Sequence, residues 1–282
     1  MKLHKDNAEI WVPDGTPVDK ALARTTHMGI SAHQDDIEIM AMEGVLKAFG
    51  QPDLWFTGVV VTDGAGSDRI GIYKDYTNEE MCAIRRIEQK KAAFVGEYSA
   101  IALLDHSSKE VRDSANNKPV EDLAALVDAC SPEVVYMHNL ADKHPTHIAT
   151  ALRTIKAIRS LPKDKRPKKV YGCEVWRDLD WMIDDDKKPM VLDSHENIAT
   201  SLVGLFDSQV IGGKRYDLAT IGRRRAHATY FESHKADNHT MINFGMNLTP
   251  LIEDDSLDIT EYVLGFIKRF SDEVEGNLKK LA

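Results

Sequence analysis

Five short runs of apolar residues in the first part of the chain predict five buried strands. The run Val59-Val60-Val61 has no polar residue between its apolar positions, which is typical of a strand buried on both faces. Strands of this kind occur in parallel sheets that helices cover on both sides. The five strands are expected near 28–32, 55–62, 100–104, 133–137 and 170–175.

Helical patterns separate these runs, and several have a recognisable start or stop. Gly50 is a good C-terminal breaker for the first helix, and Pro119 suits the first turn of a later one. Thr77, with Glu80 three residues later, forms a capping-box pattern. The alternation of strands and helices predicts an α/β fold with a mostly parallel sheet. Helices are expected at about 37–49, 77–95, 120–129 and 145–158.

The second half of the chain has helical stretches but few strand-like runs. The acidic run at 184–186 is expected to be an exposed turn. No repeat or low-complexity linker divides the chain, so 1–282 is predicted to be a single domain. Within it, about 26–175 is expected to form the sheet core, and about 176–282 to wrap the sheet edge or build the wall of a cleft. Further helices are expected at 198–206, 218–231 and 259–278, the last of them amphipathic.

The charge of the chain argues against nucleic acid as a partner. Its 282 residues carry a formal net charge of -9, whereas a nucleic-acid groove needs clustered Lys and Arg. No segment approaches the roughly 20 apolar residues of a membrane span, and the N-terminus lacks the apolar stretch of a signal peptide. The three cysteines are far apart, as expected of reduced thiols. We expect a cytoplasmic protein, and the sequence leaves a homo-oligomer open.

A cluster of polar residues follows the first predicted strand. His33, Asp35, Asp36 and Glu38 stand where that strand ends and its helix begins, and ligands bind at this carboxyl edge in open α/β sheets. A His and an Asp three residues apart can bring a nitrogen and an oxygen to one metal ion, and both are ordinary zinc ligands. Asp35 would then remain free to act as a base.

A second polar cluster follows the fourth predicted strand. Pro145 suits the first turn of a helix, and His144 and His147, three residues apart, share one face of it. In a doubly wound sheet of the dinucleotide-binding order, the first and fourth strands are neighbours. The two clusters are therefore expected to meet, and together they predict a metal site.

Each cluster also has a structural interpretation. Asp35 and Asp36 are suited to capping the following helix, because acidic residues favour its positive end. His144 can do the same for the later helix, and His147 can be a partly buried surface histidine. Short motifs often arise by chance, so the metal site rests on the convergence of both clusters rather than on either one.

These residues resemble the LmbE/PIG-L family of zinc-dependent N-acetylglucosaminyl deacetylases. The family's Ala-His-Pro-Asp-Asp-Glu stretch is matched by Ala32-His33-Gln34-Asp35-Asp36, and its His-Pro-Asp-His stretch by His144-Pro145-Thr146-His147. The Gly64-Ala65-Gly66-Ser67 loop and the helix with Arg85-Arg86-Ile87-Glu88-Gln89 are also similar to the family. The match extends in order from about Thr26 to Val175.

The resemblance implies a Rossmann-like, doubly wound sheet and assigns roles to seven residues. It implies zinc bound by His33, Asp36 and His147, with Asp35 as general base and His144 stabilising the oxyanion. It also implies substrate contacts by Arg85 and His227. From the residues alone, Arg85 belongs equally well to a solvated helix face, and His227 lies among arginines on an amphipathic helix.

The chain departs from the family pattern at four positions. Gln34 replaces a proline, Ile37 stands at the acidic position although Glu38 follows, and Thr146 replaces an aspartate. Asp142 occupies a position where some members have a tyrosine that contributes to catalysis. None of these departures removes a metal ligand, but they bear on the substrate and on the tuning of His144.

The resemblance implies removal of an acetyl group from an N-acetylated amino-sugar conjugate by zinc-activated water. Two alternatives remain open: an amidase acting on a non-sugar acylated amine, and an inactive protein that binds a metal or ligand. A nitrogen and oxygen ligand set also admits Fe²⁺ or another divalent transition metal. Trp176 is expected in the core or in a surface turn rather than stacked on a sugar.

Overall fold

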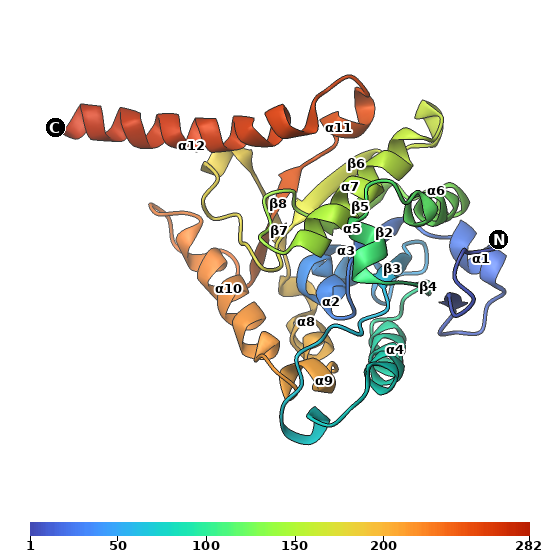
Figure 1. Cartoon of the computed structure of the whole chain (residues 1–282). Coiled ribbons are helices and arrows are strands. Elements are labelled where there is room, and N and C mark those ends of the chain that lie inside the picture. The colour runs from blue at the N-terminus through green and yellow to red at the C-terminus, as the bar shows by residue number, and fades with distance from the viewer.

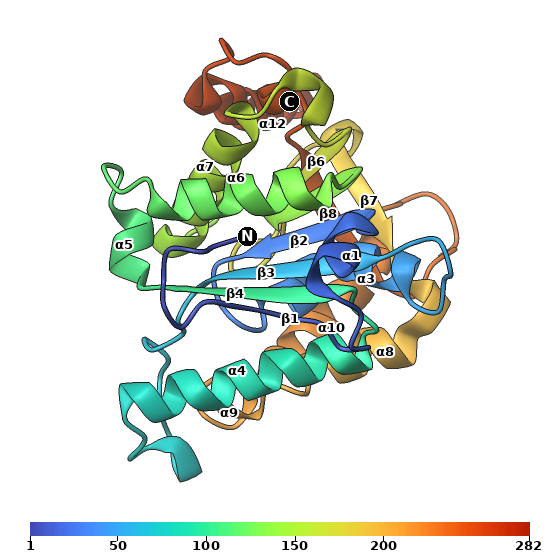
Figure 2. The same ribbon diagram turned by 90° about the vertical axis from the view of Figure 1, so that its right-hand side faces the viewer.

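The computed structural model describes residues 1–282 and contains one eight-stranded sheet with helices on both faces (Figures 1 and 2). The strands lie in the order β1-β4-β3-β2-β5-β6-β8-β7. Strands β2 to β6 pair in parallel, whereas β1, β7 and β8 pair antiparallel with their neighbours. The strand bounds are β1 Glu9–Trp11, β2 His27–Ser31, β3 Phe56–Thr62, β4 Ala100–His106, β5 Val134–His138, β6 Lys169–Cys173, β7 Lys187–Val191 and β8 Ile242–Asn247.

The predicted mostly parallel α/β fold is confirmed, because β2 to β6 correspond to the five expected strands. The first and fourth of these, β2 and β5, are paired neighbours, with His27 opposite Val134 and Ile30 opposite Met137. Parallel neighbours end at the same edge of a sheet. The polar segments that follow β2 and β5 therefore begin side by side.

Three antiparallel strands, β1, β7 and β8, were not predicted from the sequence. Strand β1 has only three residues, and β7 begins with Lys187, Lys188 and Pro189, a pattern that argues against a buried strand. Pro189 is tolerated because β7 is the last strand of the sheet, where one side has no ladder partner.

Twelve α-helices and four short 3₁₀ segments surround the sheet. The capping box of Thr77 and Glu80 is present as expected and opens α4. The acidic run expected as a turn forms the 3₁₀ segment η3, Asp184–Asp186. The helix bounds are α1 Val18–Ala23, α2 Asp36–Met40, α3 Met42–Ala48, α4 Asn78–Val95, α5 Ser108–Arg112, α6 Lys118–Cys130, α7 Pro145–Arg159, α8 Glu196–Val203, α9 Asp207–Val210, α10 Tyr216–Tyr230, α11 Pro250–Glu253 and α12 Ile259–Leu281.

The single helix expected after β2 is instead two helices, α2 and α3, which break at Ala41 (φ -103°, ψ 18°). Arg224 and Asn243, from α10 and β8, donate hydrogen bonds to the carbonyl oxygen of Ile39, and Arg224 also reaches that of Glu38. Buried side chains that satisfy these carbonyl groups allow a helix to end there. The prediction of one continuous helix was wrong because these partners lie about 200 residues away in sequence.

Two apolar clusters fill the core, one on each face of the sheet. Val59 and Val61 belong to one cluster and Val60 to the other, so the central run of β3 is buried on both faces as its sequence predicts.

The three cysteines, Cys82, Cys130 and Cys173, are free thiols. None of the helices combines the length and the apolar character that crossing a membrane requires.

Candidate metal centre and active site

A pocket of about 420 Å³ opens at the carboxyl edge of the sheet, beside β2 and β5. Its wall includes His33, Asp35 and Asp36 from the segment after β2, and His144 and Thr146 from the start of α7. The remaining lining comes from the loop after β3, from α4 and α5, and from the second half of the chain. A volume of this size is typical of small-molecule sites, which span about 300–1,000 Å³.

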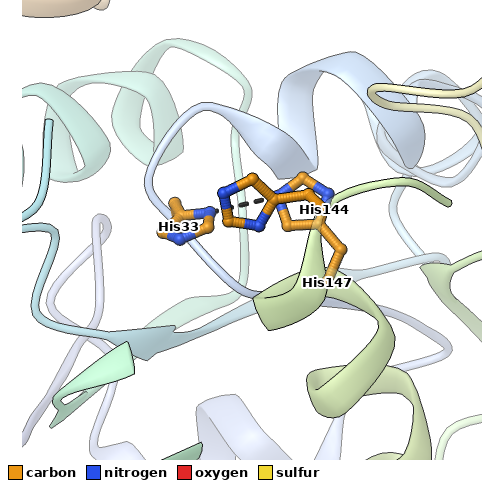
Figure 3. Close-up of side chains that lie close together, drawn as sticks. All are labelled: His33, His144 and His147. Atoms are coloured by element: carbon orange, nitrogen blue, oxygen red, sulfur yellow. Dashed lines mark hydrogen bonds between the residues drawn. The ribbon is translucent and has the colours of Figure 1, made fainter. Parts of the chain in front are cut away.

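Three side chains from the two motifs place one donor atom each at a common point beside this pocket. His33 Nδ1 lies 3.1 Å from His147 Nε2 and 3.2 Å from Asp36 Oδ2, and His147 Nε2 lies 3.4 Å from the same carboxylate oxygen. Figure 3 shows the imidazole of His33 directed at that of His147, with His144 beside them. The convergence expected from the sequence is therefore present in the fold.

The spacing of these three donors fits a tetrahedral divalent metal ion. Zinc bonds of about 2.0–2.2 Å in a tetrahedron separate neighbouring ligand atoms by about 3.3–3.6 Å. The observed separations of 3.1, 3.2 and 3.4 Å are close to these values. Three protein donors leave one vertex for water or substrate, which is the catalytic rather than the structural pattern.

The electrostatics of the cluster favour the ligand forms of its members. Burial lowers the pKa of His147 to about 3, so its imidazole is neutral and keeps a lone pair. Burial opposes ionisation of Asp36, but the surrounding histidines, His147 and His138, outweigh it and hold the pKa of that carboxyl well below its usual range. A neutral imidazole and a carboxylate are the forms that bind metal ions.

Asp142 orients His147 from the side away from the donor cluster. Its Oδ2 accepts from His147 Nδ1 at 3.5 Å and from the backbone N–H of Trp176 at 3.1 Å, while Oδ1 accepts from the N–H of His144 at 2.9 Å. A carboxylate on the outer nitrogen of a metal-binding histidine fixes the tautomer that directs the other nitrogen to the metal. The sequence had marked Asp142 only as a departure from the family pattern.

Replacing Asp142 by Asn is expected to weaken zinc binding about 10- to 100-fold. Asn keeps an acceptor for only one of the two backbone N–H groups, because the other oxygen becomes an amide NH₂. It also removes the charge opposite His147. Competition titration with a chromophoric chelator measures the affinity, and Asp185→Asn, at an exposed position of η3, is the matched control. Equal affinities for both variants and the wild type would contradict this role.

A further histidine, His138, lies beside the cluster and was missed by the sequence analysis. It ends β5, is fully buried, and stacks on His147 with ring centroids 3.9 Å apart. Its Nε2 lies 3.4 Å from Asp36 Oδ2 but accepts the backbone N–H of Ala32 at 2.8 Å. Because that lone pair is already used, His138 fits a role in holding the end of β2 better than a role as ligand.

Asp35 is held in an unusual backbone conformation beside the donor cluster. Its φ is 92°, in a region that residues with a side chain adopt at a cost. Its N–H donates to Gln89 Oε1 at 3.3 Å, and its carboxylate lies 3.8 Å from Arg85. Burial and the charge of Asp36 raise the pKa of Asp35 well above its usual range, although Arg85 acts in the opposite direction.

Arg85 lines the pocket, but its guanidinium N–H groups donate several hydrogen bonds within the protein. Its guanidinium donates to the carbonyl oxygens of Gly64 (3.1 Å) and Gln34 (2.7 Å) and to the hydroxyl of Ser67. Gln34 in turn donates to the carbonyl oxygen of Thr62. The predicted substrate contact therefore competes with a clear local function, which is to tie the loop after β3 to the segment bearing Asp35.

His144 and Trp176 also line the pocket. The rings of His33 and His144 meet edge to face at 5.1 Å, and His144 lies parallel to Trp176 at 6.3 Å. Burial and the charge of His33 lower the pKa of His144, so the imidazole is neutral and carries one N–H donor. Tyr216 meets the edge of Trp176 at 6.1 Å. Trp176 packs against one of the two core clusters and lies in a bend, as expected, and it also lines the pocket.

His227, expected to contact substrate, does not lie in the pocket wall. It is buried on α10, stacks on Phe244 at 4.2 Å and lies 3.5 Å from the carboxylate of Glu174. Burial lowers the pKa of His227 to about 4 and raises that of Glu174 to about 7. The structure groups the other six predicted residues and separates His227 from them.

Residues 28–158 match the model of the PIG-L family, described as GlcNAc-PI de-N-acetylase. The match includes both motifs that supply the donor cluster. No curated protein sequence matches the chain.

Several solved structures share the fold at low sequence identity. N,N′-diacetylchitobiose deacetylase from Pyrococcus horikoshii superposes with a TM-score of 0.62 and 16% identity, covering 85% of this chain and 89% of its own. The 4-carboxy-2-hydroxymuconate hydratase GalB from Pseudomonas putida KT2440 gives 0.61 and 16%, with coverage of 79% and 95%. The A40926 pseudoaglycone deacetylase Dbv21 gives 0.58 and 15%, with coverage of 79% and 97%.

Proposed function

Because the chain belongs to the PIG-L family through the domain at residues 28–158, we propose that it is a metal-dependent hydrolase that deacetylates an N-acetylated amino-sugar conjugate. The observation that carries the proposal is the donor cluster of His33, Asp36 and His147 next to the buried carboxyl of Asp35, at a pocket that His33, Asp35 and Asp36 line. Fold alone does not decide the reaction, since one of the similar structures is a hydratase.

The three donors suit zinc or iron, and Zn²⁺ remains the first expectation. A divalent ion held there supplies Lewis acidity toward water and toward a carbonyl oxygen. The other contributions to the reaction come from the side chains around the donor cluster.

Asp35 is the proposed general base. Its raised pKa brings the carboxyl closer to the working pH, which suits a group that first takes a proton and then returns it. The proton comes from the attacking water, whose oxygen forms a bond to the acyl carbon. When the carbon–nitrogen bond breaks, the same proton passes to the leaving nitrogen, so that acetate and a free amine result.

His144 is the proposed oxyanion donor. It lines the same pocket as Asp35, lies beside His33, and its neutral imidazole offers one N–H. A preorganised donor of this kind typically contributes about 3 kcal/mol to transition-state stabilisation. Arg85 supports the reaction indirectly, because it holds the Gln34 carbonyl and faces the carboxylate of Asp35.

An amino sugar is the substrate class that the pocket and the comparisons support. The family model is described by an N-acetylglucosamine conjugate, and two structures with this fold are deacetylases. Trp176 and Tyr216 give the wall an aromatic surface, and such surfaces suit the apolar face of a sugar ring. Substrate contacts by Arg85 and His227 are not part of this proposal.

Two broader expectations also remain proposals. The chain is treated as one domain over 1–282, and the pocket supports this because its lining comes both from the core at 26–175 and from Trp176, Gln209 and Tyr216 beyond it. A cytoplasmic location is consistent with the three free thiols.

Acetate release tests the proposed function. The protein, loaded with Zn²⁺ or Fe²⁺, is incubated with N-acetylglucosamine, N,N′-diacetylchitobiose and a non-sugar acetamide, and chelator-treated protein serves as control. Metal-dependent release from the sugars supports the proposal. Release from the non-sugar amide alone indicates the amidase alternative, and no release from any acetamide by the loaded protein would leave a metal- or ligand-binding protein.

A further inference from the structure

The C-terminal helix α12 carries an apolar face that no part of the chain covers. Figure 1 shows α12 running along one side of the molecule. Its C-terminal end projects beyond the sheet and beyond the other helices of the chain. Phe266 is its only buried residue. Five apolar residues lie at the three- and four-residue spacing of one helix face and are between 38% and 84% exposed: Ile267, Phe270, Val274, Leu278 and Leu281.

The first half of α12 is firmly attached to the body. Phe266 packs in the core, the hydroxyl of Tyr262 donates to the carbonyl oxygen of Asn247 at 2.7 Å, and Arg269 pairs with Asp186 at 2.6 Å. Asp258 caps the N-terminus. Because the helix is formed and anchored before any partner arrives, little ordering free energy opposes its association.

We propose that α12 pairs antiparallel with α12 of a second copy of this chain, about a two-fold axis near residue 272. With Val263, the exposed apolar residues form three layers that are symmetric about that position. Val263 lies against the partner's Leu281, Ile267 against the partner's Leu278, and Phe270 against the partner's Val274. A two-fold interface requires this self-complementarity.

Charge on the flank of the apolar face favours the same register. In the register centred near residue 272, Glu275 lies beside the partner's Lys268. The two-fold axis repeats this pair, so the interface contains it twice. Within each chain, Lys268 also pairs with Asp272 and Glu275 with Lys279, so the contact joins two intrahelical pairs into one network.

A membrane surface is the less favourable occupant of this face. Amphipathic helices that lie on anionic lipid carry a predominantly basic polar face. In α12 the basic residues Lys268, Arg269, Lys279 and Lys280 are balanced by Glu261, Asp272, Glu273 and Glu275. The chain as a whole has a net charge of -9, which also opposes approach to an anionic surface.

Sedimentation equilibrium of the full chain over a dilution series measures the association. The dimer is expected to appear at twice the chain mass of 31.6 kDa, and the double variant Ile267→Asp/Leu278→Asp is expected to remain a monomer with an unchanged thermal midpoint. A wild-type protein that is monomeric at every concentration, or a dimer that survives this double substitution, overturns the proposal. So does binding of the wild type, but not the double variant, to anionic phospholipid vesicles without self-association.

Charge reversal tests the antiparallel register itself. Glu275→Lys and Lys268→Glu each place like charges together twice, so each is expected to raise the dimer dissociation constant about tenfold. An equal mixture of the two variants restores both opposite-charge pairs and is expected to form a heterodimer with nearly wild-type affinity. Lys280→Glu, on the other flank, is the control for altered net charge. Absence of rescue in the mixture contradicts this register.

Discussion

Replacing Asp35 by Asn is expected to lower kcat about 10²- to 10⁴-fold while leaving the metal content unchanged. The carboxyl is buried beside the donor cluster but is not one of the three atoms that converge there. Asn fills the same space and keeps the backbone bond from the Asp35 N–H to Gln89. The substitution therefore removes the proton acceptor and the negative charge that faces Arg85.

Steady-state acetate release and metal analysis of the same preparation measure this prediction. The matched control is Asp68→Asn, which changes an exposed carboxylate in the wall of the same pocket and is expected to have little effect on kcat. If Asp35→Asn retained wild-type turnover with metal bound, another group would have to be the base.

Replacing Arg224 by Met is expected to lower the free energy of unfolding by about 3–5 kcal/mol. Arg224 is fully buried, and its guanidinium donates to the carbonyl oxygens of Ala199 (2.8 Å) and Glu38 (2.7 Å), among other acceptors. Met fills much of the volume but leaves these carbonyl groups without a donor. Burial lowers the pKa of Arg224 to about 9, so it remains charged at neutral pH.

Urea unfolding in the presence of chelator measures this loss, because bound metal would otherwise stabilise the folded state. Arg225→Met is the matched control. Arg225 is an exposed neighbour on the same helix whose ion pair with Glu196 is expected to contribute about 0–1 kcal/mol. Equal losses for the two variants would show that the buried bonds to the α2 carbonyl groups contribute nothing beyond a surface pair.

The sequence was sufficient to predict the parallel core and the meeting of the two motifs. The reason is local: the apolar run around Val60 marks a strand buried on both faces, and the Thr77 capping box marks a helix start. The strand order then follows from a general rule for doubly wound sheets. His33, Asp36 and His147 are brought together by that order alone.

The residues that support the site could not be found in the same way. The role of Asp142 as a partner of His147 follows only from the orientation of the His147 imidazole. The role of His138 follows only from the pairing of β2 with β5, which brings its ring to the N–H of Ala32. Arg224 acts across more than 180 residues of sequence, on carbonyl groups that a helix normally satisfies itself. His227, by contrast, was expected from its sequence context to contact substrate, but it is buried beside Glu174 and does not line the pocket.

The three antiparallel strands were missed for a related reason. The Lys187-Lys188-Pro189 start of β7 is acceptable only at a sheet edge, and a single sequence does not say which strand lies there. Trp176 shows the same limit, because an aromatic residue after a strand suits a core, a turn or a pocket wall equally well.

Metal content tests the central claim most directly. Protein purified without a histidine tag or chelator is analysed by mass spectrometry, with a His33→Ala/Asp36→Ala variant prepared in parallel. We expect about one zinc or iron per wild-type chain and its loss from the variant. Equal metal content in the two proteins, or a wild type that binds no divalent metal on titration, would contradict the metal-dependent account.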